Sequence, residues 1–391
     1  MLGFLMNVLV VNDGCERRQL DSARLKDYFG INGCTLVKRP QDADLIVIVT
    51  CAFNQEKEDL SIELIRHYQQ YTAEVVVLGC LPAIAPQRLA TIHTGKSLPT
   101  VEHHRIDEWF PEFSTGLDDI ADATDLDGPP KWFLLRKALR RSLQGQLGSR
   151  MVKRLPKMLS STGHLRISYG CLGDCTYCGI RNAIGRLKSK PLAQILLEYQ
   201  TLLERGCKRI RILADDTGAW GLDTGSSLPL LLSALDQATA RKVSWELDQV
   251  HPVWAVRYQD ALRDLIASGR IDSMLVSVQS GSPSVLRSMR RFPDVDKVRD
   301  ALAGFTRAHK DFSLLTDVIV GFPGETDEDF GQTVALLLAC GFAYVNIFGY
   351  TDREVCDARN LDDKVPRQVI DRRIHTLTKA LAKADIRHEV L

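Results

Sequence analysis

The chain has 391 residues, of which 45% are hydrophobic and 25% charged, so it is long enough for two or three domains with sizeable cores. Its net charge of +1 excludes a protein that binds nucleic acid or membranes through a uniformly basic surface. Ten cysteines in so long a chain, with no secretory signal expected, exclude a small disulfide scaffold and favour metal-binding thiols in a reducing cytoplasm. The apolar run ending at Val11 is too short to cross a bilayer, so no membrane span is expected.

The first hundred residues alternate short apolar strands with amphipathic helices. We expect strands at 8–11, 44–49 and 74–78, and helices at 20–29 and 54–71. Strands that alternate with helices predict a parallel, doubly wound α/β domain, which we assign to residues 1–114.

A cysteine follows each of these strands. Cys15 stands after the first strand, Cys51 after the second and Cys80 after the third. Because the carboxyl ends of parallel strands share one edge of the sheet, where ligands bind, we expect the three thiols to meet in space. Three unrelated buried thiols are the alternative interpretation.

Two segments of opposite charge follow, and we assign residues 115–163 to a linker. Residues 102–127 hold nine acidic residues and one arginine, whereas residues 129–163 hold nine basic residues and no acid. Apolar and basic residues are interleaved in the second segment, which predicts a basic amphipathic helix at 131–157. This helix either docks an anionic partner, such as RNA, an acidic protein, a peptide or a membrane surface, or is a linker helix facing the acidic segment.

Strands and helices alternate again from Leu165 onward. We expect strands beginning near residues 165, 209, 243, 273, 314 and 343, with helices at 192–204, 229–239, 258–267, 295–308 and 328–339. Six βα units predict an incomplete (β/α)6 barrel over residues 164–365, with its chemistry at the carboxyl ends of the strands. A last helix is expected within residues 366–391.

Directly after the first barrel strand, three cysteines follow one another at the spacing C-x3-C-x2-C: Cys171, Cys175 and Cys178. Three thiolates on one tight loop can hold three corners of a four-iron cluster and leave the fourth iron open for a cofactor or substrate. The alternative is a zinc knuckle, which usually takes four ligands, but no fourth Cys or His follows nearby. The loop resembles the cluster loop of the radical S-adenosylmethionine (SAM) enzymes, including the aromatic Tyr177 before the last cysteine.

The surroundings of the first three cysteines resemble one family within the radical SAM enzymes, the methylthiotransferases. The matching residues are Gly14-Cys15, Asp21-Ser22, Ala43-Asp44, Thr50-Cys51 and Gly79-Cys80. The resemblance implies a second four-iron cluster on Cys15, Cys51 and Cys80. Arg18 and Val49 stand where the family usually has asparagine, so we expect the surroundings of this cluster, and hence its potential or ligand preference, to differ.

The resemblance extends across the barrel, to Val278-Gln279-Ser280-Gly281-Ser282, to Met289-Arg290-Arg291 and to the run from Thr316 to Thr326. It implies that five residues help to hold SAM: Tyr177, Gln279, Ser280, Gly321 and Pro323. Asp215 replaces an amide of the family at a strand end. It either pairs with a cationic group such as the methionyl ammonium or caps the following turn.

The resemblance implies that the barrel cluster cleaves SAM to a 5′-deoxyadenosyl radical, while the second cluster delivers sulfur and a second SAM supplies the methyl group. An unactivated C–H becomes C–S–CH3, with electrons from an external flavodoxin- or ferredoxin-like donor. No side chain is identified as a catalytic acid or base. Family members that modify tRNA continue into a small β-barrel called TRAM, for which the residues after Lys383 are too few. We therefore expect a peptide, protein or natural-product precursor as the substrate rather than nucleic acid.

Four alternatives stay open from the sequence. The chain could modify tRNA, with the basic segment in place of TRAM. It could insert sulfur without methylation, or use the second cluster as an electron relay for another C–H functionalisation. It could also be a metal-stabilised binding or sensor protein that has lost its chemistry. Product mass separates the enzymes, and 5′-deoxyadenosine formation separates them from the last alternative.

Overall fold

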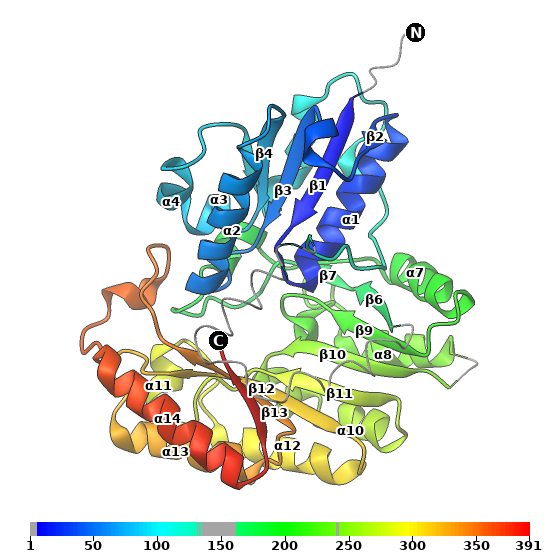
Figure 1. Ribbon diagram of the computed structural model, residues 1–391. Helices are drawn as coiled ribbons and strands as arrows, with labels where there is room; N and C mark the ends of the chain where they lie inside the picture. Colours follow the sequence, from blue (N-terminus) through cyan, green and yellow to red (C-terminus); the bar gives the residue numbers. More distant parts are fainter. Residues whose placement is uncertain (1–5, 131, 133, 135–161, 240–241) are drawn as a thin grey trace. The chain divides into compact units, whose positions relative to one another are not determined.

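The computed structural model describes residues 6–130, 132, 134, 162–239 and 242–391 (Figure 1). These residues form two compact units. The first comprises the chain up to His164 together with Gly179–Gly185, and the second comprises Leu165–Cys178 and Arg186–Leu391. The basic helix predicted at 131–157 lies outside the described residues, apart from Trp132 and Leu134. In the described part of the chain, no helix has the length and apolar character needed to cross a membrane.

The first unit is built on a five-stranded sheet in the order β2-β1-β3-β4-β5, and every pairing in it is parallel. The strands are β1 (Asn7–Asn12), β2 (Thr35–Leu36), β3 (Leu45–Thr50), β4 (Glu74–Gly79) and β5 (Ser97–Pro99). The helices are α1 (Glu16–Ile31), α2 (Gln55–Tyr68), α3 (Leu81–Ile84), α4 (Pro86–Ala90) and α6 (Ile180–Ile184). Short 3-10 helices span Pro40–Asp42, Thr100–Trp109 and Leu117–Asp119. The predicted parallel α/β domain is confirmed.

The strand order explains where a ligand would bind in this unit. The chain runs from β1 to β2 on one side and then returns to β3 on the other, so the order reverses between β1 and β3. Ligands of open parallel sheets bind at the carboxyl ends of strands beside such a reversal. Cys15 follows β1 and Cys51 follows β3, so both flank the reversal. β3 is buried at every position, which agrees with a strand covered on both faces.

The second unit contains a seven-stranded sheet in the order β14-β13-β12-β11-β10-β9-β6. The strands are β6 (Thr162–Arg166), β9 (Arg209–Leu213), β10 (Ser244–Val250), β11 (Ile271–Val276), β12 (Ser313–Val320), β13 (Tyr344–Gly349) and β14 (Arg387–Val390). The pairings from β9 to β14 are parallel. The six expected strands are confirmed, and together with their helices they form the expected partial barrel. β14 was not expected, because its sequence is mostly polar.

Helices follow the strands of this unit, as predicted. They are α7 (Leu192–Glu204), α8 (Leu228–Gln237), α9 (Pro252–Arg257), α10 (Gln259–Ala267), α11 (Pro283–Ser288), α12 (Val295–Ala308), α13 (Asp327–Ala339) and α14 (Arg367–Lys383). A small antiparallel ladder joins β7 (Ser168–Tyr169) to β8 (Lys188–Ser189), and 3-10 turns span Thr217–Ala219 and Asp357–Asn360. The buried core of this unit lies between the sheet and these helices, with Trp245, Tyr199 and Phe305 among its largest side chains.

Candidate functional site: two groups of three cysteines

The three thiols of the first unit lie at one edge of its sheet. Cys15 is the residue that precedes α1, and Cys80 precedes α3. The Cys15 and Cys51 side chains lie near enough to interact with each other, and Cys80 lies near enough for its charge to act on Cys51. Cys51 and Cys80 are buried, and Cys15 is half-buried. The structure therefore brings together the three cysteines that the strand pattern predicts to meet.

The contact between Cys15 and Cys51 favours one negative charge on this pair. The hydrogen bond from Cys51 lowers the pKa of Cys15 well below its usual value, against burial, and the Arg17 and Arg18 charges add to this effect. The same hydrogen bond raises the pKa of Cys51, and burial adds to it. Cys15 thus becomes the thiolate first, which is the protonation state that binds a metal.

A buried polar set supports Cys51. The Asp13 carboxylate accepts a hydrogen bond from the Cys51 amide at 3.0 Å and one from the Ser61 hydroxyl at 2.7 Å. The Lys57 ammonium donates to the Asp13 carbonyl at 3.2 Å. Burial raises the pKa of Asp13 to about 6, although Lys57, Ser61 and the Cys51 amide oppose this shift. These contacts fix the backbone on both sides of the reversal between β1 and β3.

The two positions that depart from the family pattern behave differently. Arg18 is buried beside Cys15, forms an ion pair with Asp21 at 3.0 Å and is hydrogen-bonded to Thr100. Val49 belongs to the hydrophobic core of the unit. The expectation that both line the site therefore holds for Arg18 alone, because the Val49 side chain packs into the core of the sheet.

In the second unit, the loop after β7 gathers the other three cysteines. A side chain at Gly173 would place its Cβ 3.7 Å from the sulfurs of both Cys171 and Cys175, so the glycine leaves the space between them open. The Gly173 amide also lies 3.4 Å from the Cys171 sulfur. Cys178 is exposed, and its charge reaches Cys171. All three thiols of this loop therefore lie close together.

Hydrogen bonds fasten this loop to the helices that follow β11 and β13. The Thr176 amide donates to the Met289 carbonyl at 3.2 Å, and its hydroxyl donates to the Ser288 carbonyl at 2.9 Å. The buried Cys356 thiol donates to the Tyr177 carbonyl at 3.2 Å. The loop is thus held in place by the protein itself. The remaining cysteines Cys34, Cys207 and Cys340 are also buried.

Arg291 connects the cysteine loop to the barrel. Its Nη1 lies 3.6 Å from the Cys175 sulfur and 3.2 Å from the Tyr177 hydroxyl, while its Nη2 donates to the Ser277 carbonyl at 2.5 Å. Its Nε is buried without a partner among the described residues. A cation in this position compensates negative charge on the thiolates, and one of its donors stays available to a ligand.

Two adjacent aspartates follow β9, and they differ in burial. Asp215, the residue that sequence reasoning selected, is half-buried, whereas Asp216 is buried and accepts a hydrogen bond from the Trp254 indole at 3.0 Å. Burial raises the pKa of Asp216 to about 6. Burial, followed by the negative charge of Asp216, also raises the pKa of Cys171 to about 12. Asp216 is therefore the carboxylate with the stronger influence on the cysteine loop.

The other four residues expected to hold SAM lie after β11 and β12. Gln279 has a positive φ of 66°, and its side-chain oxygen is buried without a partner in the described chain. The Ser280 hydroxyl is within hydrogen-bonding distance of the Thr333 hydroxyl and the Ser282 amide, so it fixes the local turn. Gly321 and Pro323 are buried in the turn after β12, where the Gly321 amide donates to Glu325 at 2.8 Å.

Three thiols in each unit are the type and number of protein ligands that a four-iron cluster with one open iron takes. In the described part of the chain, no three His, Cys, Asp or Glu side chains already form a set that would hold a single metal ion. A four-iron cluster binds each thiolate at a different iron, so its ligands lie farther apart than those of one ion. In the second unit, the space over Gly173 and the unpartnered atoms of Asp216, Gln279 and Arg291 suit a cluster with a polar ligand beside it.

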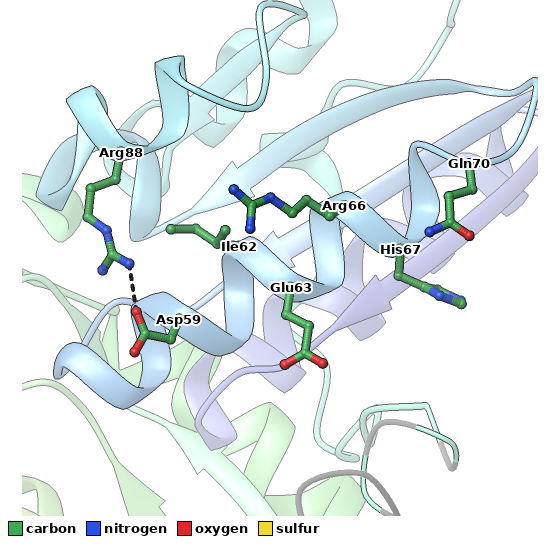
Figure 2. A pocket seen from close by; sticks show the side chains of 7 residues that line it. All are labelled: Asp59, Ile62, Glu63, Arg66, His67, Gln70 and Arg88. Atoms are coloured by element: carbon green, nitrogen blue, oxygen red, sulfur yellow. Dashed lines mark hydrogen bonds and ion pairs between the residues drawn. The ribbon is translucent and has the colours of Figure 1, made fainter. Parts of the chain in front are cut away.

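A separate pocket of about 500 Å³ lies on α2, on the face opposite Lys57 and Ser61. Figure 2 shows the residues that line it: Asp59, Ile62, Glu63, Arg66, His67, Gln70 and Arg88. Arg88 forms an ion pair with Asp59 at 2.6 Å. Mixed charges and a wide opening make it a surface feature, and none of the cysteines lines it.

Comparison with known proteins agrees with this geometry. Residues 165–337 match the profile of the Radical SAM superfamily, and residues 7–98 match Uncharacterized protein family UPF0004. The ribosomal protein uS12 methylthiotransferase RimO of Alkalilimnicola ehrlichii is 29% identical over 372 residues, which cover 93% of this chain and 78% of that protein. Together these matches support the radical SAM methylthiotransferase family.

A further relative and a solved structure agree with this comparison. The probable threonylcarbamoyladenosine tRNA methylthiotransferase of Pyrococcus horikoshii is 28% identical over 356 residues, covering 89% of this chain and 78% of that protein. The radical SAM methyltransferase TsrM from Kitasatospora setae has the same fold, with a TM-score of 0.61, 13% identity and coverage of 91% and 77% of the two chains. The chain is thus a radical SAM transferase, and its family uses two four-iron clusters and SAM.

Sequence reasoning missed four residues that the structure brings to these sites: Asp13, Lys57, Asp216 and Arg291. The sequence offered a feature that could have identified two of them: Arg291 lies in a run that matches the family, and Asp216 is adjacent to the selected Asp215. Lys57 and Asp13 had none beyond their nearness to a cysteine in the chain, because charged residues at such positions are usually solvated.

Proposed function

We propose that the chain transfers a methylthio group to an unactivated C–H of a protein or peptide, with Cys171, Cys175 and Cys178 holding the radical-generating cluster and Cys15, Cys51 and Cys80 holding the sulfur-carrying one. The observation that supports this most is the gathering of each group of three thiols at the carboxyl ends of strands in its own unit. When bound, the clusters and SAM supply the radical and the sulfur.

The side chains of this protein then bind and orient these groups. Asp216 and Gln279 each offer the ammonium of SAM a buried oxygen that has no partner among the described residues, and the Arg291 Nε offers a donor. Gly321 shapes the turn after β12 beside this site, because its φ of +81° favours glycine and Ile370 fills the space where a Cβ would lie. Tyr177 is held by Arg291 beside Cys175, where its ring shields the cluster from water.

The choice of a protein substrate rests on the net charge of the chain and on the names of its relatives. The net charge of +1 provides no general attraction for RNA, and the RimO relatives are named for a ribosomal protein. A relative named for tRNA is nearly as similar, so tRNA is the runner-up. An external flavodoxin- or ferredoxin-like donor would supply the electrons, and the family's reducing chemistry agrees with the cytoplasmic location that the cysteine content predicts.

The test is product mass. The reconstituted chain is incubated without oxygen with SAM, dithionite and either ribosomal proteins or bulk tRNA. The proposal expects 5′-deoxyadenosine and a protein that gains the mass of a methylthio group in place of hydrogen. A bare thiol on the product would indicate sulfur insertion without methylation. A methylthio group on tRNA and not on protein would identify tRNA as the substrate. Release of 5′-deoxyadenosine with no sulfur on any product would overturn the methylthio proposal.

A further inference from the structure

A lysine lies near the thiols of the first unit, where its ammonium contacts the backbone two residues before Cys15. Lys57 is in the first turn of α2, three residues after Asn54, whose side chain accepts a hydrogen bond from the Lys57 amide at 2.9 Å. Its ammonium donates to the Asp13 carbonyl at 3.2 Å. The negative charges of both Cys51 and Cys15 act on this ammonium. A cap thus fixes the start of α2, and the Lys57 side chain reaches back to the Asp13 carbonyl at the end of β1, two residues before Cys15.

The ammonium keeps its charge in this position. A lysine ammonium is protonated at neutral pH, and here one of its three N–H groups donates to the Asp13 carbonyl. Throughout the described chain, no carboxylate lies within 4.0 Å of this ammonium as an ion-pair partner. Arg18, a buried cation near Cys15, already forms an ion pair with Asp21 at 3.0 Å. Lys57 is therefore the cation that is available to a new anion.

An anion is what the sulfur-carrying site has to accommodate. Three thiolates already bring negative charge into a buried region, and a sulfide or persulfide on the open iron adds more. Buried negative charge is costly unless a cation or hydrogen-bond donors compensate it. An ammonium with two remaining N–H groups supplies both a positive charge and hydrogen-bond donors. Lys57 satisfies this requirement at the edge of the sheet where the three thiols meet.

We propose that Lys57 is a positioning residue that holds an anionic sulfur ligand, sulfide or persulfide, at the cluster of Cys15, Cys51 and Cys80. This inference rests on the proposed function and adds the group that retains the sulfur. Lys57 also stabilises the reduced, more negative state of that cluster, so it raises the midpoint potential.

The experiment uses the full chain with Cys171→Ala, Cys175→Ala and Cys178→Ala, so that only the first unit holds a cluster. After anaerobic reconstitution, hydrosulfide is titrated in and followed by the electron paramagnetic resonance spectrum of the reduced cluster. The midpoint potential is measured by redox titration in the same samples. Lys57→Gln is expected to bind hydrosulfide about tenfold more weakly, which is the loss expected for one charge-assisted hydrogen bond. Its midpoint potential is expected to become more negative.

Two further variants make the result specific. Lys57→Arg keeps the charge and is expected to bind hydrosulfide within about threefold of the unchanged chain. Arg66→Gln removes the same charge from the opposite face of α2, where Arg66 lines the surface pocket of Figure 2, and is expected to change neither quantity. Iron content and circular dichroism of each variant report cluster retention and folding separately.

The outcomes distinguish this inference from the proposed function. If Lys57→Gln and Arg66→Gln bind hydrosulfide equally well at equal potentials, Lys57 has no such role and the inference is wrong. If Lys57→Arg loses as much as Lys57→Gln, the effect reflects packing and the inference is also wrong. If the chain without the barrel cysteines holds no iron, the proposed sulfur-carrying cluster fails first, and the role of Lys57 fails with it.

Discussion

The Arg291 guanidinium lies 3.6 Å from the Cys175 sulfur, measured from Nη1 to Sγ. The same guanidinium contacts the Tyr177 hydroxyl and the Ser277 carbonyl, so it joins the cysteine loop to the end of β11. A planar, permanently charged fork suits this bridging position better than a lysine ammonium would. The relationship makes Arg291 a support of the loop before any cluster is bound.

Replacement of Arg291 is expected to weaken the loop. Arg291→Gln loses the bridge to Ser277 and Tyr177, so we expect the free energy of unfolding to fall by about 2–4 kcal/mol and the barrel cluster to lose iron. Urea unfolding and iron analysis measure both. Arg290→Gln is the matched control, because Arg290 is exposed and pairs with Asp357. Its contacts with the cysteine loop are long, 3.5 Å to the Asp174 carbonyl and 3.8 Å to the Asp174 carboxylate, so its loss is expected to cost less than about 1 kcal/mol. Equal behaviour of the two variants would contradict the role of Arg291.

Glu325 predicts a pH dependence of stability. Burial raises its pKa from 4.5 to about 7, although the Gly321 amide and Arg373 oppose the shift. Below pH 4.5 the Glu325 carboxyl is protonated in both the folded and the unfolded protein. Between pH 4.5 and 7 only the unfolded state loses the proton, so stability falls as the pH rises. Glutamine does not titrate, so the free energy of unfolding of Glu325→Gln is expected to rise by about 3 kcal/mol relative to that of the unchanged chain as the pH passes through this window. Urea unfolding at pH 5 and pH 8 tests this, and a constant difference would contradict it.

Gly321 is expected to tolerate no side chain. Its φ is +81°, and a Cβ would lie 2.3 Å from the Ile370 side chain of α14. Gly321→Ala therefore combines backbone strain with a clash, and we expect it to destabilise by about 2–4 kcal/mol. Gly324 has a φ of +79° but nothing within 4 Å, so Gly324→Ala isolates the strain, at about 1 kcal/mol. Thermal unfolding compares them, and equal losses would show that Ile370 does not limit the site.

Asp216 is expected to control the reactivity of Cys171. Its negative charge raises the pKa of the Cys171 thiol in addition to burial, and Asp215 contributes less. Asp216→Asn should therefore increase the rate of Cys171 alkylation by iodoacetamide at pH 8 in the metal-free protein, because a larger fraction is thiolate. Asp215→Asn serves as the control with a smaller effect. Peptide mass spectrometry gives both rates, and a larger effect from Asp215→Asn would favour the residue that the sequence suggested.

The sequence predicts the elements well where periodicity is strong. Strand and helix alternation predicted three of the five strands in the first sheet and the six expected barrel strands, but missed the short β2 and β5. The position of each cysteine after a strand predicted the grouping. Adjacent residues at a strand end point to different sides, so the sequence alone did not separate Asp215 from the more buried Asp216. β14 was missed because strand 387–390 is mostly polar. Lys57 was missed because nothing local predicts that a helix-start lysine is turned toward thiols.

Iron counting on matched variants tests the central claim most directly. Each chain is reconstituted without oxygen, and iron is measured per protein in the unchanged chain, in Cys15→Ala/Cys51→Ala/Cys80→Ala and in Cys171→Ala/Cys175→Ala/Cys178→Ala. Two independent clusters predict about eight irons in the first chain and about four in each variant. An unchanged chain that holds about four irons, all lost with the barrel cysteines and none with Cys15, Cys51 and Cys80, would contradict the account.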